Sequence, residues 1–206
     1  RYQIETISVV DNGVGMHRVQ LRRALKIGDG THMQSTDGMG RFGVGLPQSS
    51  VSQANEFRVW SWENGADSAL MTKINIKDRD WLDSQHRAVP APENSPIPSD
   101  VTAFFDVEDS GTIVRWSDLE RLDWKQGKTL YENTNLIAGR MYREWLRENL
   151  VAIRFVVYDI DTHEIRSTDG NQQIWDIQPN DPLYRITGPG MPVPVCSECE
   201  SLGLEF

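Results

Sequence analysis

A carboxylate followed by two glycines stands near the start of the chain, in the run Asp11-Asn12-Gly13-Val14-Gly15-Met16. The preceding run Ile4–Val10 is rich in β-forming residues, so Asp11 stands where a predicted strand stops. A carboxylate buried at such a position is costly unless it meets a hydrogen-bond donor. The amino group of adenine is such a donor, and Gly13 and Gly15 would let the flat base approach the main chain. The same run also fits an ordinary Asp-Asn-Gly turn, and the motif alone leaves both interpretations open.

A second glycine-rich run, Gly40-Arg41-Phe42-Gly43-Val44-Gly45, leads into a helix predicted over Gln48–Ala54, with Pro47 suited to its first turn. Main-chain N–H groups at a helix start, with the helix dipole behind them, bind phosphate oxygens without a dedicated cation. The alternative is a loop whose glycines serve only a tight chain reversal. The dinucleotide fingerprint does not fit, because it should follow a strand directly and the polar stretch 29–39 intervenes. A P-loop does not fit either, because Gly127-Lys128-Thr129 lacks the upstream glycine.

The third motif is Gly111-Thr112, which opens a predicted strand over Thr112–Trp116. In this order and spacing, the three motifs resemble the ATP-binding domain of the GHKL class. This fold is shared by gyrase-type topoisomerases, ninety-kilodalton heat-shock chaperones, histidine kinases and MutL-type mismatch-repair proteins. The segment Gly40–Trp62 is most similar to the chaperone, MutL and MORC branches, because histidine kinases usually carry a Gly-x-Gly-Leu-Gly-Leu form. The resemblance covers roughly residues 4–116.

The resemblance implies a role for each matching position. Asp11 would accept a hydrogen bond from the adenine amino group. Gly15 and Met16 would line the pocket for the base, and Thr112 would bind the amino end of the base through a water. Residues 28–39 would form a lid over the triphosphate, and the N–H groups after it would hold the phosphates, with Arg41 either adding a charge-assisted contact or remaining a solvated surface arginine. The full set implied to bind nucleotide is Asp11, Gly13, Gly15, Met16, Gly40, Arg41, Phe42, Gly43, Val44, Gly45 and Thr112.

The catalytic parts that the family carries are not among these motifs. In the family, the Glu that activates water and the Asn that holds Mg²⁺ stand on a helix upstream of the Asp motif, whereas this chain begins ten residues before Asp11. The resemblance therefore implies an ATP and Mg²⁺ site whose general base and metal ligand lie outside these 206 residues. We expect Arg1 to be an internal cut in a longer ATPase. Lid closure in that protein would change its shape or its homodimer state, and so act on a DNA or protein client.

Two alternatives remain: a non-catalytic nucleotide-binding or scaffold module, and a histidine-kinase-like phosphotransferase. The second needs a phosphoacceptor His on an upstream helix, whereas the four histidines of this chain fall in predicted turns or loops. Lys125 and Lys128 are candidates for a γ-phosphate contact, although solvated loop lysines are the stronger interpretation.

The elements that position these motifs favour an α+β fold, and the resemblance implies the Bergerat form of it: a two-layer sandwich with a mixed sheet covered on one face by helices. Helices are predicted around Leu21 and Leu25 with Gly28 as C-cap, at Gln48–Ala54, and at Leu130–Leu150. Strands are predicted at Ile4–Val10, Phe57–Trp62, Ala69–Ile76, Thr102–Val107, Thr112–Trp116 and Val151–Tyr158, the last with Glu164–Ser167 as its partner. Asn64-Gly65 predicts a type I′ hairpin turn, and residues 89–100 an irregular surface loop. We divide the chain into 1–116, an ATP-binding domain lacking its N-terminal helix, and 117–206, the start of a transducer-like α/β region.

Composition limits the partners. The net charge of −9 disfavours a general nucleic-acid surface, because phosphate backbones are held mainly by Lys and Arg. No apolar run is long enough to span a membrane. Cys196 and Cys199 are half of a zinc knuckle with nothing to complete it, so two ordinary thiols in a reducing cytoplasm are expected. The expected partners are ATP and ADP, a DNA or protein client, and a second copy of the chain.

Overall fold

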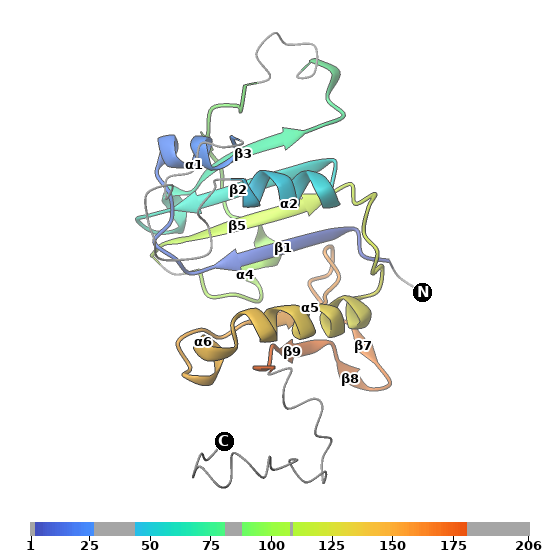
Figure 1. Cartoon of the computed structure of the whole chain (residues 1–206). Coiled ribbons are helices and arrows are strands. Elements are labelled where there is room, and N and C mark those ends of the chain that lie inside the picture. The colour runs from blue at the N-terminus through green and yellow to red at the C-terminus, as the bar shows by residue number, and fades with distance from the viewer. Residues whose placement is uncertain (1–2, 27–43, 81–87, 108, 181–206) are drawn as a thin grey trace, which may run out of the picture. The chain divides into compact units, whose positions relative to one another are not determined.

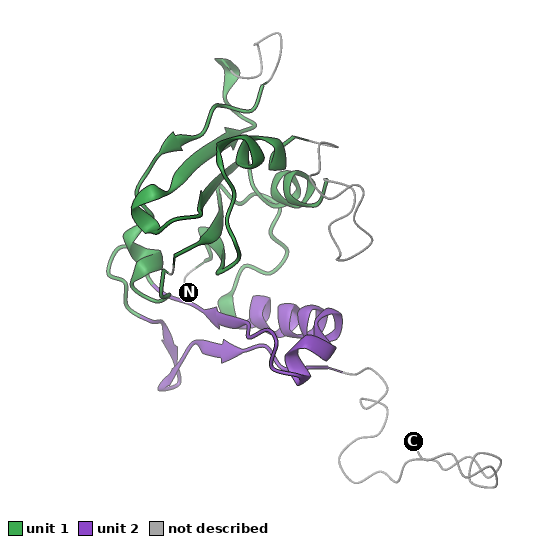
Figure 2. Cartoon of the chain, turned by 90° about the vertical axis from the view of Figure 1, so that its left-hand side faces the viewer, with its two compact units in different colours: residues 1–127, 159–164 green, residues 128–158, 165–206 purple. Residues whose placement is uncertain are grey.

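The computed structural model describes residues 3–26, 44–80, 88–107 and 109–180 (Figure 1). The chain divides into two compact units, coloured separately in Figure 2. Unit 1 comprises Arg1–Gly127 with Asp159–Glu164, and unit 2 comprises Lys128–Tyr158 with Ile165–Phe206. The division into domains 1–116 and 117–206 stays a prediction. Among the described residues, no helix is long and apolar enough to cross a membrane.

Unit 1 is built on a five-stranded sheet with the strand order β1-β5-β2-β3-β4. The strands are β1 (Thr6–Asp11), β2 (Glu56–Trp62), β3 (Leu70–Asn75), β4 (Glu93–Asn94) and β5 (Gly111–Ser117). Each neighbouring pair is antiparallel, whereas the sequence analysis expected a mixed sheet. The α+β class is confirmed, with helices packed on an antiparallel sheet.

Two helices cover one face of this sheet (Figure 1). They are α1 (Arg18–Ala24) and α2 (Gly45–Gln53). Side chains alternate between the faces of a strand, so Phe57 and Val59 of β2 both point to this side, where they share a core cluster with Leu21. The helix α1 ends at its C-cap Leu25, before the predicted Gly28, which lies outside the described residues. Its predicted apolar face is confirmed, since Leu21 and Leu25 are both buried.

The opposite face is covered as well, which differs from the expected single helical layer. Trp60 and Ile113 point to it and form a second core cluster with Val101 of the short helix α4 (Ser99–Thr102). The predicted strand Thr102–Val107 is wrong, because α4 and turns occupy its start. Val101 and Phe105 are one helical turn apart and both pack into this cluster, so burial on this face overrides the β propensity of the run. The preceding residues 89–100 are not merely a surface loop, because they include β4 and the buried Val89.

The predicted β2–β3 hairpin is confirmed, but its turn is not. Residues 63–69 join the strands through a 3-10 helix, η1 (Ala66–Ser68). Gly65 has φ 81° and ψ 154°, and this ψ does not belong to a type I′ turn. An Asn-Gly pair therefore marks the connection correctly without fixing its length.

The described part of unit 2 contains two helices and two small two-stranded sheets. They are α5 (Gly127–Met141), α6 (Arg143–Arg147), β6 (Arg154–Val156) paired with β9 (Ile174–Asp176), and β7 (Ser167–Thr168) paired with β8 (Asn171–Gln172). The predicted helix Leu130–Leu150 is therefore divided at Tyr142. The strand at 151–158 is shorter than predicted and its main partner is β9; the expected partner segment contributes a single bridge, Tyr158 to Ile165. Tyr131 stacks on Trp175 with ring centroids 4.7 Å apart, which fixes α5 to β9.

Candidate functional site

Three polar side chains form a row across three neighbouring strands of unit 1. Asp11 of β1 lies opposite Thr112 of β5, which in turn lies opposite Ser61 of β2. Residues opposite one another on antiparallel strands point to the same face. Ser61 follows Val59 at the two-residue period of the strand, so the row is on the face that α1 and α2 cover. The register thus brings together two of the predicted nucleotide-binding residues from distant parts of the sequence.

Burial falls steadily along this row. The Ser61 side chain is fully buried and Thr112 is 8% exposed, whereas Asp11 is exposed. The sequence predicted a buried carboxylate whose hydrogen bonding an adenine base would satisfy, whereas Asp11 reaches solvent at the open end of the row. Its Oδ1 accepts a hydrogen bond from the Gly13 N–H at 2.9 Å, which holds the carboxylate at the start of the turn.

Ser61 connects the row to the glycine motif. Its hydroxyl lies 3.0 Å from the Gly111 carbonyl oxygen and 3.1 Å from the Thr112 hydroxyl. It also accepts a hydrogen bond of 2.8 Å from the Met16 N–H. The sequence analysis did not single out Ser61. Phe57, Val59 and residue 61 share one face of the strand, and the first two are apolar core residues. A serine at the third position is therefore the feature of the sequence that could have indicated a special role.

The segment 13–16 runs against the end of β2. Gly15 has φ +73°, in the left-handed region that favours glycine. A Cβ at this position would lie 2.0 Å from the Trp62 carbonyl oxygen, so a side chain cannot enter without moving main chain. The partly buried Met16 packs against the core beneath α1. Gly15 is therefore required by close approach as well as by conformation.

The helix α2 begins at the same end of the sheet as the row. It ends at Gln53, just before β2 begins at Glu56, and so its first turn lies toward the end at which β2 finishes (Figure 1). Its N-cap is Val44, no side chain caps it, and its first turn contains no acidic residue. Helix-start N–H groups that no side chain caps can bind an anion, and among the described residues no capping bond is made to this turn. Of the predicted phosphate-binding run, Val44 and Gly45 are placed here; Gly40, Arg41, Phe42 and Gly43 lie outside the described residues, as does the predicted lid.

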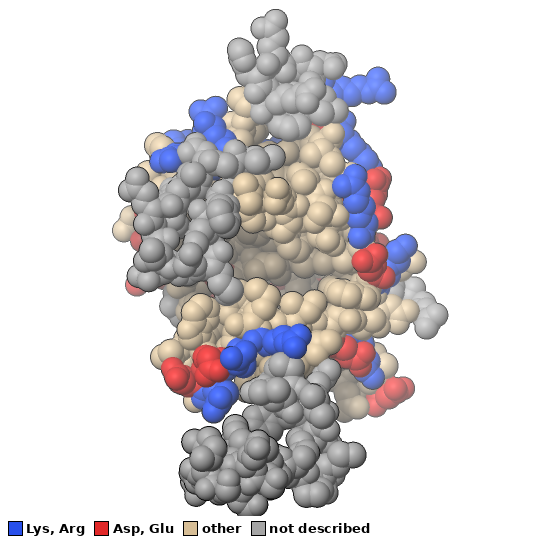
Figure 3. Space-filling model, viewed as in Figure 1, with Lys and Arg blue, Asp and Glu red and all other residues tan. Residues whose placement is uncertain are grey.

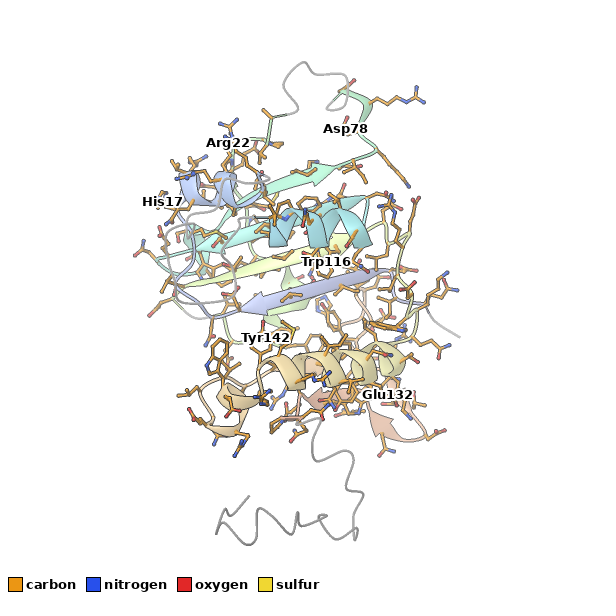
Figure 4. The ribbon with its side chains drawn as sticks, viewed as in Figure 1. His17, Arg22, Asp78, Trp116, Glu132 and Tyr142 are labelled. Carbon is orange, nitrogen blue, oxygen red and sulfur yellow. The ribbon has the colours of Figure 1, made fainter. Side chains whose placement is uncertain are left out.

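Below α2, the indole of Trp116 fixes the helix to the sheet. Trp116, labelled in Figure 4, donates a hydrogen bond of 2.9 Å from its Nε1 to the hydroxyl of Ser50. Ser50 is fully buried. Figure 3 shows that the surface of unit 1 over α2 is largely uncharged, with Lys, Arg, Asp and Glu gathered at its margins. This side of the sheet therefore offers an uncharged surface (Figure 3) flanked by the polar row and a helix start, and the exposed side chains of α2 on it include Gln48, Ser49 and Ser52.

One charged cluster of unit 1 lies at the other end of the sheet from the polar row. Lys77 Nζ pairs with Asp118 at 3.0 Å and also with Glu120. The bond to Glu120, and then that to Asp118, raises the pKa of the Lys77 ammonium, and Lys77 lowers the pKa of both carboxyls. Asp118 also accepts hydrogen bonds from Asn55, which precedes β2 and so belongs to the end of the sheet remote from the row.

The other candidate residues are readily placed. Lys125 and Lys128 are exposed. His17 caps α1 by accepting from the Val19 N–H, and His163 lies in a turn, so both have local structural roles. Within the described ranges, no group of three or more His, Cys, Asp or Glu side chains could hold a metal ion. Cys196 and Cys199 are outside these ranges.

A family model described as "Histidine kinase-, DNA gyrase B-, and HSP90-like ATPase" matches residues 1–112. The match covers more than half of the chain, and it includes all three motifs, from Asp11 through the glycine run to Thr112. It confirms the resemblance drawn from those motifs. No curated protein matches the sequence significantly.

Proposed function

Because the chain belongs to the histidine kinase-, DNA gyrase B- and HSP90-like ATPase family, we propose that it holds ATP or ADP between the polar row and the start of α2. Binding of ATP is the general property of this family. The specific assignment is that the adenine amino group donates to the Asp11 carboxylate, with Gly13, Gly15 and Met16 beside the base and Thr112 at the same end.

The observation that carries this assignment is the cross-strand pairing of Asp11 with Thr112. It supports one recognition site built from two motifs that are far apart in the sequence. A carboxylate exposed at the end of the row can accept from an exocyclic amine, and a ligand that covers it would strengthen that bond by excluding water. The segment 13–16, held by Ser61, gives the base a wall with little side-chain bulk.

The phosphates would lie toward the first turn of α2. The N–H groups after Val44 and the helix dipole favour an anion there without a cationic side chain. Gly40, Arg41, Phe42 and Gly43 directly precede this turn in sequence, and we assign them to the same phosphate site. The α2 start has no acidic residue that would repel the triphosphate.

Mg²⁺ would neutralise phosphate charge in this family, and it is held largely by the phosphates themselves with few protein ligands. We further propose that the protein hydrolyses ATP and couples hydrolysis to a change of shape or homodimer state that acts on DNA or a protein client. The similarity of Gly40–Trp62 favours the chaperone, MutL and MORC branches.

The test is a calorimetric titration of the 206-residue chain with ADP and with GDP, with and without Mg²⁺. We expect ADP to bind more tightly than GDP. Asp11→Asn should weaken ADP binding by about tenfold or more, because a charge-assisted hydrogen bond contributes roughly 1.5–3 kcal/mol. Asp169→Asn is the matched control, since Asp169 is an exposed aspartate in a turn of unit 2 and Asn is tolerated at its φ of 53°. Equal ADP affinity in Asp11→Asn and the unchanged chain would contradict the assignment.

A further inference from the structure

The hydroxyl of Ser61 has three neighbours within hydrogen-bond distance, and their chemistry fixes where its proton goes. The Met16 N–H can only donate, and the Gly111 carbonyl can only accept. The Thr112 hydroxyl can do either. A serine hydroxyl has one proton to donate and two lone pairs to accept with.

All three contacts can be hydrogen bonds together in one arrangement only. Ser61 donates its proton to the Gly111 carbonyl and accepts from Met16 with one lone pair. Its second lone pair is then left for Thr112, so the Thr112 hydroxyl must donate to Ser61. Ser61 is fully buried, and a buried polar group left unsatisfied costs about 1–3 kcal/mol, which favours this saturated arrangement.

The consequence concerns the open side of Thr112. With its proton committed to Ser61, the Thr112 hydroxyl can only accept from a ligand or a water. Its neighbour along the row, Asp11, is also an acceptor when ionised. The two groups together then present acceptors only.

We propose that Ser61 is a specificity-determining residue: by taking the Thr112 proton, it makes the row favour a 6-aminopurine over a 6-oxopurine. This inference rests on the proposed nucleotide site. An amino group at the purine 6-position donates to acceptors, whereas a carbonyl oxygen there meets lone pairs on both Asp11 and Thr112. Ser61 itself does not need to touch the base.

The test compares ADP with IDP, whose purine carries a 6-oxo group in place of the 6-amino group and a hydrogen on N1. Calorimetry gives the ratio of the two affinities for the unchanged chain, Ser61→Ala and Ser61→Thr. Ser61→Ala releases the Thr112 hydroxyl to rotate and donate to a carbonyl, so the preference for ADP should fall by about tenfold, the value of roughly one hydrogen bond. Ser61→Thr keeps the hydroxyl and should restore the preference. A purely structural role would weaken ADP and IDP alike and leave their ratio unchanged.

Thr112→Val provides a second measurement that does not depend on Ser61 variants folding. If Thr112 is an acceptor, its removal lowers the preference for ADP; if it is a donor toward the ligand, its removal raises that preference. An unchanged ratio in a folded Ser61→Ala chain, or a raised ratio in Thr112→Val, overturns the inference while leaving nucleotide binding intact. An unchanged chain that binds no ADP overturns the proposed function as well.

Discussion

Gly15→Ala tests whether close approach of the main chain builds the candidate site. The added methyl group would lie 2.0 Å from the Trp62 carbonyl oxygen, and real Cβ atoms essentially never come within 3.0 Å of a neighbour. The segment must therefore move by at least about 1 Å, because close-packed structure leaves no other space. The left-handed conformation at φ +73° adds roughly 1–2 kcal/mol for a residue with a Cβ. Movement would also stretch the partly buried hydrogen bond from Met16 to Ser61, at a cost of about 1 kcal/mol or more.

The total for Gly15→Ala is about 3 kcal/mol of lost stability, together with an ADP affinity reduced at least about tenfold. Gly170→Ala is the matched control. Gly170 also has a positive φ, of +79°, but an added Cβ would meet nothing within 4 Å. Gly170→Ala should lose only the stability that comes from placing a residue with a Cβ in the left-handed conformation, roughly 1–2 kcal/mol, and should bind ADP as tightly as the unchanged chain. Denaturant unfolding gives the stabilities and calorimetry the affinities. Equal losses in both variants, with ADP binding unchanged in Gly15→Ala, would refute the reasoning.

Two further predictions concern stability. Asp100 and Arg115 form a mostly buried ion pair with N–O 2.6 Å, at side-chain exposures of 7% and 12%; Asp100→Ala should therefore destabilise the chain by about 3–5 kcal/mol in denaturant unfolding. The double variant Asp100→Leu with Arg115→Met should lose less, and a larger loss would contradict the assignment of the cost to a stranded charge. Lys77 lowers the pKa of the Asp118 and Glu120 carboxyls in the folded chain. The two ionised carboxylates therefore stabilise the fold at pH values above their unfolded-state pKa values, and this stabilisation is lost as the pH falls through their folded-state pKa values. Lys77→Met should thus flatten the acid side of the stability–pH curve at low salt; an unchanged curve would show that solvent screens this exposed pair completely.

The sequence predicted those parts of the site that depend on local chemistry. Asp11 at a strand end and glycines ahead of a helix are readable because turn and helix-start preferences act over a few residues. Ser61 was missed because its role depends on register: only the pairing of β2 with β5 brings it beside Thr112. No local preference of Ser61 indicates a partner about fifty residues later in the chain.

The errors in the fold have a similar origin. Thr102–Val107 has the composition of a strand, yet Val101 and Phe105 are used at helical spacing against the second core cluster. Asn64-Gly65 predicts a type I′ turn but does not form one. The tight turn of this kind joins β7 to β8, where Asp169 and Gly170 both have the positive φ that a type I′ turn requires. Asn-Gly and Asp-Gly pairs indicate where the chain reverses direction, and tertiary packing decides which of these reversals is a tight two-residue turn.

The strand order β1-β5-β2 has a consequence for how the protein is synthesised. β5 inserts between β1 and β2 although it is made after both of them, so Asp11 acquires its cross-strand neighbour only when Gly111–Ser117 has left the ribosome. Until then, β1 and β2 have no shared partner, and closing so long a loop makes this pairing a slow step of folding. On the proposed assignment, a nascent chain that contains Asp11 adds about a hundred further residues before Thr112 can pair with it, and ATP can stabilise only chains in which the sheet is already complete.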